Sequence, residues 1–195
     1  MVIGITGNSG TGKSTAALIL AKLIDAKVID ADKIVREEQT KGKLYYKKII
    51  RCFGSGILQA NEEIDRKKLA NIIYEDKEKR EKINKITKQY IVPIIIKKAK
   101  NTDKENVILD VPLLFESNLN EICDVTIGII AEQELKAERL KLRDGNKNIE
   151  KRLDIQPKND FYIKKADYII ENNNNNLQKN MEKVWEKICM KHGKN

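Results

Sequence analysis

The strongest constraint on the fold of this chain is the stretch Gly7–Ser14, which reads GNSGTGKS. It matches the pattern G-x-x-x-x-G-K-[ST], in which glycines let backbone N–H groups point at phosphate oxygens. The apolar run VIGIT comes before it, and TAALILAKLI after it has the composition of a buried helix. Strand, loop and helix therefore follow in the order that a phosphate-binding loop needs, and a chance glycine-rich turn is the weaker alternative.

The motif assigns a role to each of its polar positions. Lys13 is expected to reach the β- and γ-phosphates, and the Ser14 hydroxyl is expected to ligate Mg²⁺. Backbone N–H groups at the start of the following helix are expected to cradle the phosphates of ATP. The predicted nucleotide-binding residues of the loop are Gly10, Thr11, Gly12, Lys13, Ser14 and Thr15.

Four further apolar segments predict strands, and they alternate with helical patterns. Such alternation predicts an α/β fold in which a parallel sheet is covered by helices on both faces and ligands gather beyond the carboxyl ends of the strands. Asp30, Asp32 and Asp110 fall at that edge together with the phosphate loop. The segments are AKVID (26–30), NVILDV (106–111), DVTIGII (124–130) and ADYIIEN (166–172).

The positive charge of the chain is concentrated in one block. Lys and Arg number 38 against 29 Asp and Glu, and residues 33–100 alone hold 19 basic and 9 acidic side chains. Two interpretations stay open: the block attracts an anionic small molecule, or it is a solvated, lysine-rich helical surface. Aromatic residues make up only 5% of the chain and no base-stacking motif occurs, so nucleic-acid binding is a distant third.

The remaining composition excludes several classes of protein. The three cysteines are far apart and lack metal-ligand spacing, and the single histidine, His192, lies near the C-terminus, which argues against a zinc site and a catalytic triad. No apolar run reaches the roughly 20 residues of a membrane span, so a soluble, cytoplasmic protein without a membrane partner is expected. GTPase base-reading and transporter signatures are also absent. A small-molecule kinase remains.

Several segments of the chain resemble those of the dephospho-CoA kinase family in order and spacing. They are GITGNSGTGKST, VIDAD, IDRKKLANIIYED, LDVPLLFE, RLKLRD, KRLDIQ and ADYIIEN. The resemblance implies ATP-dependent phosphorylation of the ribose 3′-hydroxyl of dephospho-CoA, which completes coenzyme A. It also implies a P-loop NTPase fold with a five-stranded parallel sheet: a core at 1–32, 101–143 and 161–195, a helical substrate-binding region at 33–100, and a mobile lid at 144–160.

The resemblance also suggests residues for the acceptor substrate and the nucleotide. The second Asp of VIDAD, Asp32, would meet the 3′-hydroxyl as the base, although an N-cap role for it stays open. Arg66 of IDRKKL would bind the substrate, and Asn172 of ADYIIEN the nucleotide. The residues of LDVPLLFE that would bind the substrate are Pro112, Leu113, Leu114 and Glu116. For Leu113, Leu114 and Phe115 the alternative is that they fill the core beneath the pocket.

Two charged residues beyond the loop, Asp110 and Arg143, each have two possible roles. Asp110 orients Mg²⁺ or braces the loop before Pro112. Arg143 stabilises the transferring phosphoryl group, or it pairs on the helix surface with Glu138 or Asp144. Arg139 and Arg152 are weaker candidates for the same electrostatic role.

The chain departs from the family pattern at two places. Asn8 and Ser9 stand where the loop of the family commonly has Gly and Ile, and Lys88 and Gln89 stand where it has His-Pro. The alternatives to a dephospho-CoA kinase are a nucleoside or nucleoside monophosphate kinase and, more distantly, a basic nucleic-acid-binding P-loop protein. We expect no nucleic-acid partner and favour a monomer.

Overall fold

The computed structural model describes residues 1–145, 148–174 and 176–193. The chain divides into two compact units, the first formed by Met1–Asp30 with Ala99–Asn195 and the second by Ala31–Lys98. The second unit begins and ends within two residues of the helical region predicted at 33–100. Within the described ranges, every helix is too short or too polar to cross a lipid bilayer.

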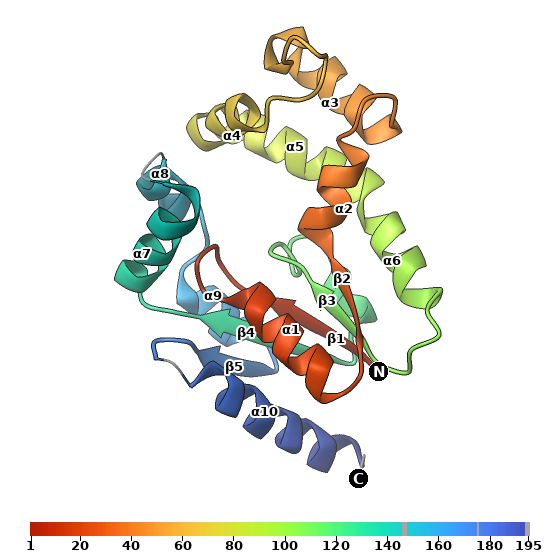
Figure 1. Cartoon of the computed structure of the whole chain (residues 1–195), viewed down its shortest axis with the longest axis vertical. Coiled ribbons are helices and arrows are strands. Elements are labelled where there is room, and N and C mark those ends of the chain that lie inside the picture. Colours follow the sequence, from red (N-terminus) through yellow and green to blue (C-terminus); the bar gives the residue numbers. More distant parts are fainter. Residues whose placement is uncertain (146–147, 175, 194–195) are drawn as a thin grey trace. The chain divides into compact units, whose positions relative to one another are not determined.

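The first unit is built on a five-stranded parallel sheet with the strand order β2-β3-β1-β4-β5 (Figure 1). All five predicted strands are confirmed. The register places Asp110 beside Ile5 on one side and beside Asp30 on the other, so both carboxylates end their strands at the same edge. The strands are β1 (Val2–Thr6), β2 (Lys27–Asp30), β3 (Val107–Asp110), β4 (Val125–Ile130) and β5 (Tyr168–Glu171).

Two long helices of the first unit, α1 (Lys13–Leu23) and α10 (Leu177–His192), pack against each other and share one hydrophobic core with the sheet. Every residue of β4 is buried, as expected for an internal parallel strand. The other helices are α7 (Gln133–Asp144), α8 (Ile149–Asp154) and α9 (Asn159–Lys165), with a 3₁₀ turn η2 (Leu119–Ile122). The core residues include Ile3, Ile5, Ala16, Leu20, Ile108, Ile127, Ile129 and Met181.

The second unit is helical. Asp65 and Asp76 cap two of its helices, each accepting hydrogen bonds from backbone N–H groups of the first turn. One helix ends at Tyr90 and the next begins at Val92, so Pro93 lies in the first turn of a helix, where a proline is tolerated. The elements are α2 (Ala31–Glu38), α3 (Leu44–Phe53), η1 (Ser55–Ile57), α4 (Arg66–Glu75), α5 (Lys77–Tyr90) and α6 (Val92–Lys100).

Candidate active site

The phosphate loop connects β1 to α1 with a backbone that requires glycine. Gly12 is the N-cap of α1 with a φ of 89°, and Gly10 has a φ of 83°. A Cβ on Gly10 would lie 2.7 Å from the backbone oxygen of Lys136. The Ala16 N–H donates to the Gly12 oxygen at 2.9 Å, so the first-turn N–H groups before it lack an intrahelical acceptor. These N–H groups form a cradle for an anion.

The carbonyl oxygens of the same loop are held by other residues. The Thr11 oxygen accepts from the side-chain amide of Asn172 at 2.8 Å, and the Asn8 oxygen accepts from the Thr11 hydroxyl at 2.9 Å. Arg139 donates to the Gly10 oxygen at 3.3 Å and to the Asn172 oxygen at 2.9 Å. Asn172, predicted to bind nucleotide, is buried and braces the loop in this structure. The carbonyl oxygens of Asn8, Gly10 and Thr11 thus accept hydrogen bonds from groups of the protein itself.

Lys13 and Asp110 form a buried ion pair at the carboxyl edge of the sheet. Only 8% of Lys13 and 2% of Asp110 is exposed to solvent, and the ammonium group donates to the carboxylate. Removing one partner of such a pair leaves an uncompensated buried charge. Asp110 therefore contacts the motif lysine directly, a partner that neither interpretation of Asp110 anticipated.

The segment after β3 divides into a buried part and a surface part. Leu114 is fully buried next to Gly4, so it fills the core, as one of the two interpretations of this segment allows. Pro112 accepts a hydrogen bond from the Thr6 hydroxyl at 3.0 Å through its carbonyl oxygen. Leu113 is 37% exposed. Glu116 also keeps much of its side chain exposed, yet the surrounding packing removes enough water from its carboxyl group to raise the pKa.

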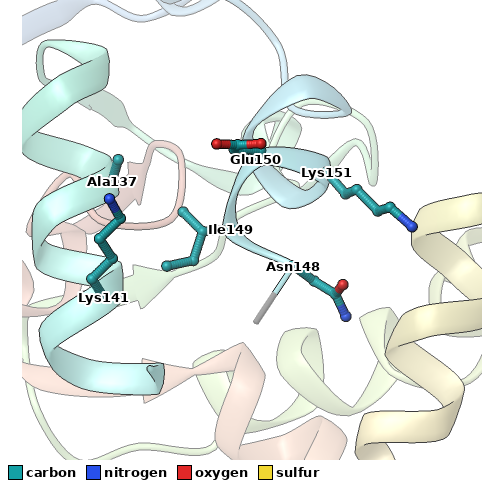
Figure 2. A pocket seen from close by; sticks show the side chains of 6 residues that line it. All are labelled: Ala137, Lys141, Asn148, Ile149, Glu150 and Lys151. Carbon is teal, nitrogen blue, oxygen red and sulfur yellow. The ribbon is translucent and has the colours of Figure 1, made fainter. Parts of the chain in front are cut away.

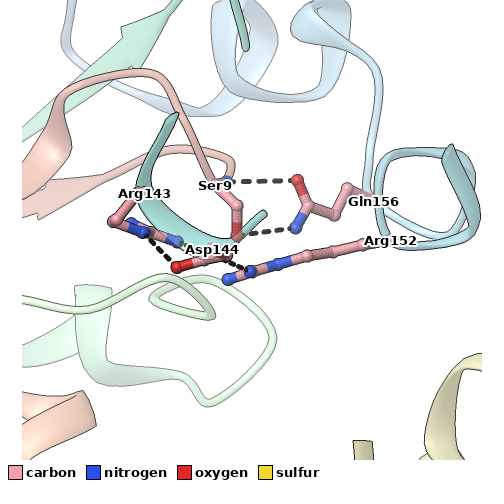
Figure 3. A network of polar contacts seen from close by, with 5 residues as sticks. All are labelled: Ser9, Arg143, Asp144, Arg152 and Gln156. Carbon is pink, nitrogen blue, oxygen red and sulfur yellow. Dashed lines mark hydrogen bonds and ion pairs between the residues drawn. The ribbon is translucent and has the colours of Figure 1, made fainter. Parts of the chain in front are cut away.

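Arg143 and Arg152 share one carboxylate, that of Asp144 at the end of α7 (Figure 3). Arg143 donates to both oxygens of Asp144 at 2.8 and 2.7 Å, and Arg152 of α8 donates at 2.8 Å. The hydrogen bond from Arg143, with a smaller contribution from Arg152, lowers the pKa of Asp144. The ion pair of Arg143 with Asp144, one of the alternatives that the sequence offered, is thus present. Arg152 binds the same carboxylate.

Contacts between the loop and the segment after α8 were not predicted. The amide of Gln156 accepts from the Ser9 N–H at 3.1 Å and donates to the Ser9 hydroxyl at 2.9 Å (Figure 3). The Asn8 amide donates to the Pro157 oxygen and accepts from the Tyr162 hydroxyl, both at 2.7 Å. Gln156 lies in the KRLDIQ segment that carried the family resemblance, but its sequence position gives no indication of this partner.

A pocket of about 440 Å³ lies between α7 and α8 (Figure 2). The apolar side chain of Ile149 on α8 is only 5% exposed, so the segment predicted as a lid contains a buried residue. Asn146 and Lys147 of that predicted lid lie outside the described residues. The lining residues are Ala137, Lys141, Asn148, Ile149, Glu150 and Lys151.

The two predicted acceptor-binding residues, Asp32 and Arg66, belong to the second unit. Asp32 lies in the first turn of α2, which begins at Ala31, so it stands one residue inside the helix and not at the N-cap. Arg66 is the first residue of α4. It lines a pocket of about 530 Å³ whose other residues are Gln39, Thr40, Gln59, Glu63, Ile64, Asp65 and Lys67.

The oxygen donors at the loop fit a metal ion that takes most of its ligands from phosphate groups and water and only a few from the protein. Among the residues that the structure describes, no three His, Cys, Asp or Glu side chains cluster as a metal site. Mg²⁺ bound with a nucleotide needs only one or two protein ligands. The exposed Ser14 hydroxyl and the Asp110 carboxylate near Lys13 are oxygen donors of the required kind.

Comparison with known proteins agrees with this geometry. A protein-family model described as dephospho-CoA kinase matches residues 1–178. A dephospho-CoA kinase of Fusobacterium nucleatum is 43% identical over 96% of this chain and 98% of its own length. A solved structure of the dephospho-CoA kinase of Campylobacter jejuni superimposes with a TM-score of 0.62 at 26% identity, covering 98% of each chain. A Thermus thermophilus structure has the same fold, with a TM-score of 0.78 at 23% identity, over 98% of this chain and 97% of its own.

Proposed function

The chain belongs to the dephospho-CoA kinase family, and we propose on that basis that it transfers the γ-phosphoryl group of ATP to the ribose 3′-hydroxyl of dephospho-CoA, giving coenzyme A and ADP. The observation that carries the proposal is the family match over residues 1–178, which contains the phosphate loop with its buried Lys13. The protein is accordingly a kinase and a transferase that uses a nucleotide.

On the nucleotide side, this chain supplies positioning and positive charge. The first-turn N–H groups of α1 would bind the phosphates, and the Lys13 ammonium group would neutralise charge on the β- and γ-phosphates. The Asp110 carboxylate accepts a hydrogen bond from that ammonium group and would help to orient it. Arg143 and Arg152 would exchange Asp144 for phosphate oxygens and stabilise the charge of the transferring group.

On the acceptor side, Asp32 would accept the proton of the 3′-hydroxyl as its oxygen attacks the γ-phosphorus. The bond between the γ-phosphorus and the β–γ bridging oxygen breaks, and ADP leaves. Arg66 would bind a phosphate group of dephospho-CoA. Pro112, Leu113 and Glu116 are the other residues that we propose for substrate binding.

Mg²⁺ would be held by the Ser14 hydroxyl, with Asp110 as a direct or water-mediated partner. The ion would neutralise phosphate charge during transfer. A chelator should therefore abolish turnover, and calorimetry should find that ATP binds more weakly without Mg²⁺. Turnover that persists in excess chelator would contradict this part of the proposal.

An acceptor panel tests the reaction itself. ADP release should be measured with dephospho-CoA, AMP, CMP and uridine, and the product should be identified by its mass and by the position of its new phosphate. We expect dephospho-CoA alone to support rapid turnover and to be phosphorylated at the 3′-oxygen. Preference for a nucleoside or a nucleoside monophosphate would replace the proposal with the alternative kinase.

Three further expectations belong to the proposal. Salt-dependent retention on single-stranded RNA or DNA should be negligible at physiological ionic strength, since no nucleic-acid partner is expected. Cell fractionation should find the protein in the cytoplasm. Light scattering should find a monomer.

A further inference from the structure

We propose that Gln156 is a positioning residue that couples nucleotide binding at the phosphate loop to the segment carrying α8, and that Ser9 is its partner in the loop. The inference rests on the proposed function for its biological meaning. Neither residue has a part in the transfer mechanism described above.

The pair is reciprocal, which sets it apart from an ordinary surface contact. The Gln156 Oε1 accepts from the Ser9 backbone N–H at 3.1 Å, while its Nε2 donates to the Ser9 Oγ at 2.9 Å. One amide group therefore fixes both the backbone and the side chain of Ser9. Such a pair holds one orientation of the Asn8–Ser9 peptide unit, which lies directly before Gly10, the first residue of the predicted phosphate cradle.

A second connection runs parallel to the first and is buried. Asn8 donates to the Pro157 oxygen and accepts from Tyr162, and only 6% of Asn8 and 2% of Tyr162 is exposed. Two consecutive loop residues thus meet two consecutive residues at the end of the α8 segment. The contact is a two-point attachment, so neither side can rotate without breaking a hydrogen bond.

The last turn of α8 itself is attached to α7. Arg152 donates to Asp144, the last residue of α7, so the short helix is held to α7 by an ion pair and to the phosphate loop through Gln156 (Figure 3). Arg152 is one of the cations proposed to stabilise the transferring group. Because Gln156 follows closely after the end of α8, which carries Arg152, the loop contact restricts where that guanidinium can be.

This arrangement gives a physical route for coupling. A loop already held in its binding conformation loses less conformational entropy when phosphate binds. A loop fixed by bound phosphate in turn offers Gln156 a fixed pair of partners, so nucleotide should order residues 148–157. Binding and ordering then favour each other to the same extent, as linkage requires.

Ser9, one of the two residues of the pair, differs from the residue that is common in the family. Ser9 stands where the family loop commonly has Ile, and an isoleucine side chain could not accept the Gln156 Nε2. Asn8 likewise replaces a Gly that could neither accept from Tyr162 nor donate to Pro157 through a side chain. These two departures from the family pattern are the residues that contact the end of the α8 segment.

A double-mutant cycle tests the coupling. Gln156→Met keeps the length of the side chain and removes both hydrogen bonds, whereas Ser9→Ala removes only the Oγ acceptor. The Kd for MgATP should be measured by calorimetry without acceptor. We expect it to rise about tenfold in Gln156→Met and about threefold in Ser9→Ala, and the double variant should match Gln156→Met alone.

The matched control is Gln178→Met on α10, where an exposed glutamine donates to Glu182 at 3.1 Å. Its Kd for MgATP should equal that of the wild type. Hydrogen exchange supplies a readout that a purely structural role would leave unchanged: MgATP should slow exchange in residues 148–157 of the wild type and of Gln178→Met, but not of Gln156→Met.

Independent effects of the two substitutions, or a Gln156→Met protein that binds MgATP as Gln178→Met does, would overturn the coupling. The proposed function is judged separately, by turnover of dephospho-CoA in the wild type. A wild type that does not phosphorylate dephospho-CoA but shows non-additive effects on the Kd would contradict the proposed reaction and support the coupling. A wild type that phosphorylates dephospho-CoA while the two substitutions act additively would support the reaction and contradict the coupling.

Discussion

The phosphate-loop end of the first unit and the predicted acceptor residues of the second unit are built in opposite ways. Lys13, Asp110 and Asn172 are buried, and each is bonded to a residue far away in the sequence. Asp32 and Arg66 stand exposed in the first turns of two helices. The nucleotide side is thus preorganised by the fold, whereas the acceptor side presents charge on short helices.

This difference has an energetic consequence that experiments can resolve. Substituting a buried, bonded charge changes the folding free energy as well as the chemistry, because its partner is left unsatisfied. Substituting an exposed residue in a first helical turn changes stability by only a few tenths of a kcal/mol up to about 1 kcal/mol. Substitutions at the loop should therefore lower activity and stability together. Substitutions of Asp32 and Arg66 should lower activity with little change in stability.

The largest effect is expected at Lys13. Lys13→Ala should lower kcat/KM by roughly a thousandfold, since the charge facing the β- and γ-phosphates is lost. The variant should also be destabilised by about 3 kcal/mol, because Asp110 stays buried without its partner. Steady-state kinetics and thermal unfolding would measure the two effects on the same sample.

A second variant separates these two losses. Lys13→Ala combined with Asp110→Asn removes both charges of the pair, so most of the stability should return while activity stays low. Recovery of near-normal turnover in the double variant would mean that Lys13 serves only to neutralise Asp110.

The next largest effect is expected at Asp32, where the comparison predicts a purely kinetic change. Asp32→Asn should reduce kcat about a hundredfold, because an amide cannot accept the proton of the 3′-hydroxyl. The Kd for ATP and the unfolding temperature should stay close to those of the wild type. Glu37→Gln, an exposed acid on the same helix, is the matched control and should leave kcat unchanged. Near-normal turnover of Asp32→Asn would remove the base from the mechanism.

The sequence predicts the nucleotide side well because its geometry is local. Gly10 and Gly12 are adjacent to the residues they serve, and the strand and helix beside them have unmistakable apolar patterns. The five strands were found for the same reason: buried parallel strands such as Val125–Ile130 are continuous apolar runs.

Contacts that depend on tertiary packing could not be predicted. Arg139 and Arg143 lie one turn apart on one helix, and the sequence favoured Arg143 for function. The structure shows Arg139 holding the loop through Gly10, a contact 129 residues apart in the chain. Helical spacing places both arginines on one face, but only the packing of α7 beside the loop decides which one meets a carbonyl oxygen.

A smaller loss, in nucleotide affinity, is expected at Arg139. Arg139→Met should raise the Kd for MgATP about tenfold, because the Gly10 and Asn172 oxygens lose their donor and the loop is less well ordered. Arg139→Lys should fall between this variant and the wild type, since a single ammonium group cannot reproduce the two-pronged contact.

Arg80 offers a matched control for Arg139 in the second unit. It donates to the Ile73 oxygen at 2.9 Å, so Arg80→Met also removes an arginine–carbonyl contact. We expect it to lower the unfolding temperature slightly and to leave MgATP binding unchanged. Equal losses of nucleotide affinity in the two variants would show a general effect of reduced stability in place of a role at the loop.

The smallest effect is expected from the excess positive charge of residues 33–100. If this charge attracts an anionic acceptor, the KM for dephospho-CoA should rise a few-fold between low salt and about 0.15 M salt, where the Debye length is only about 8 Å. Arg66→Gln should raise the KM at low salt and flatten this dependence, because one specific charge is removed from its pocket. Arg51→Gln, an exposed arginine on α3, removes the same formal charge elsewhere in the unit. Long-range attraction by net charge predicts that both variants shift the KM alike, whereas direct binding predicts a shift in Arg66→Gln alone. A KM that does not change with salt in any of the three proteins would favour a solvated lysine-rich surface and leave the acceptor to be bound by contacts that carry no net charge.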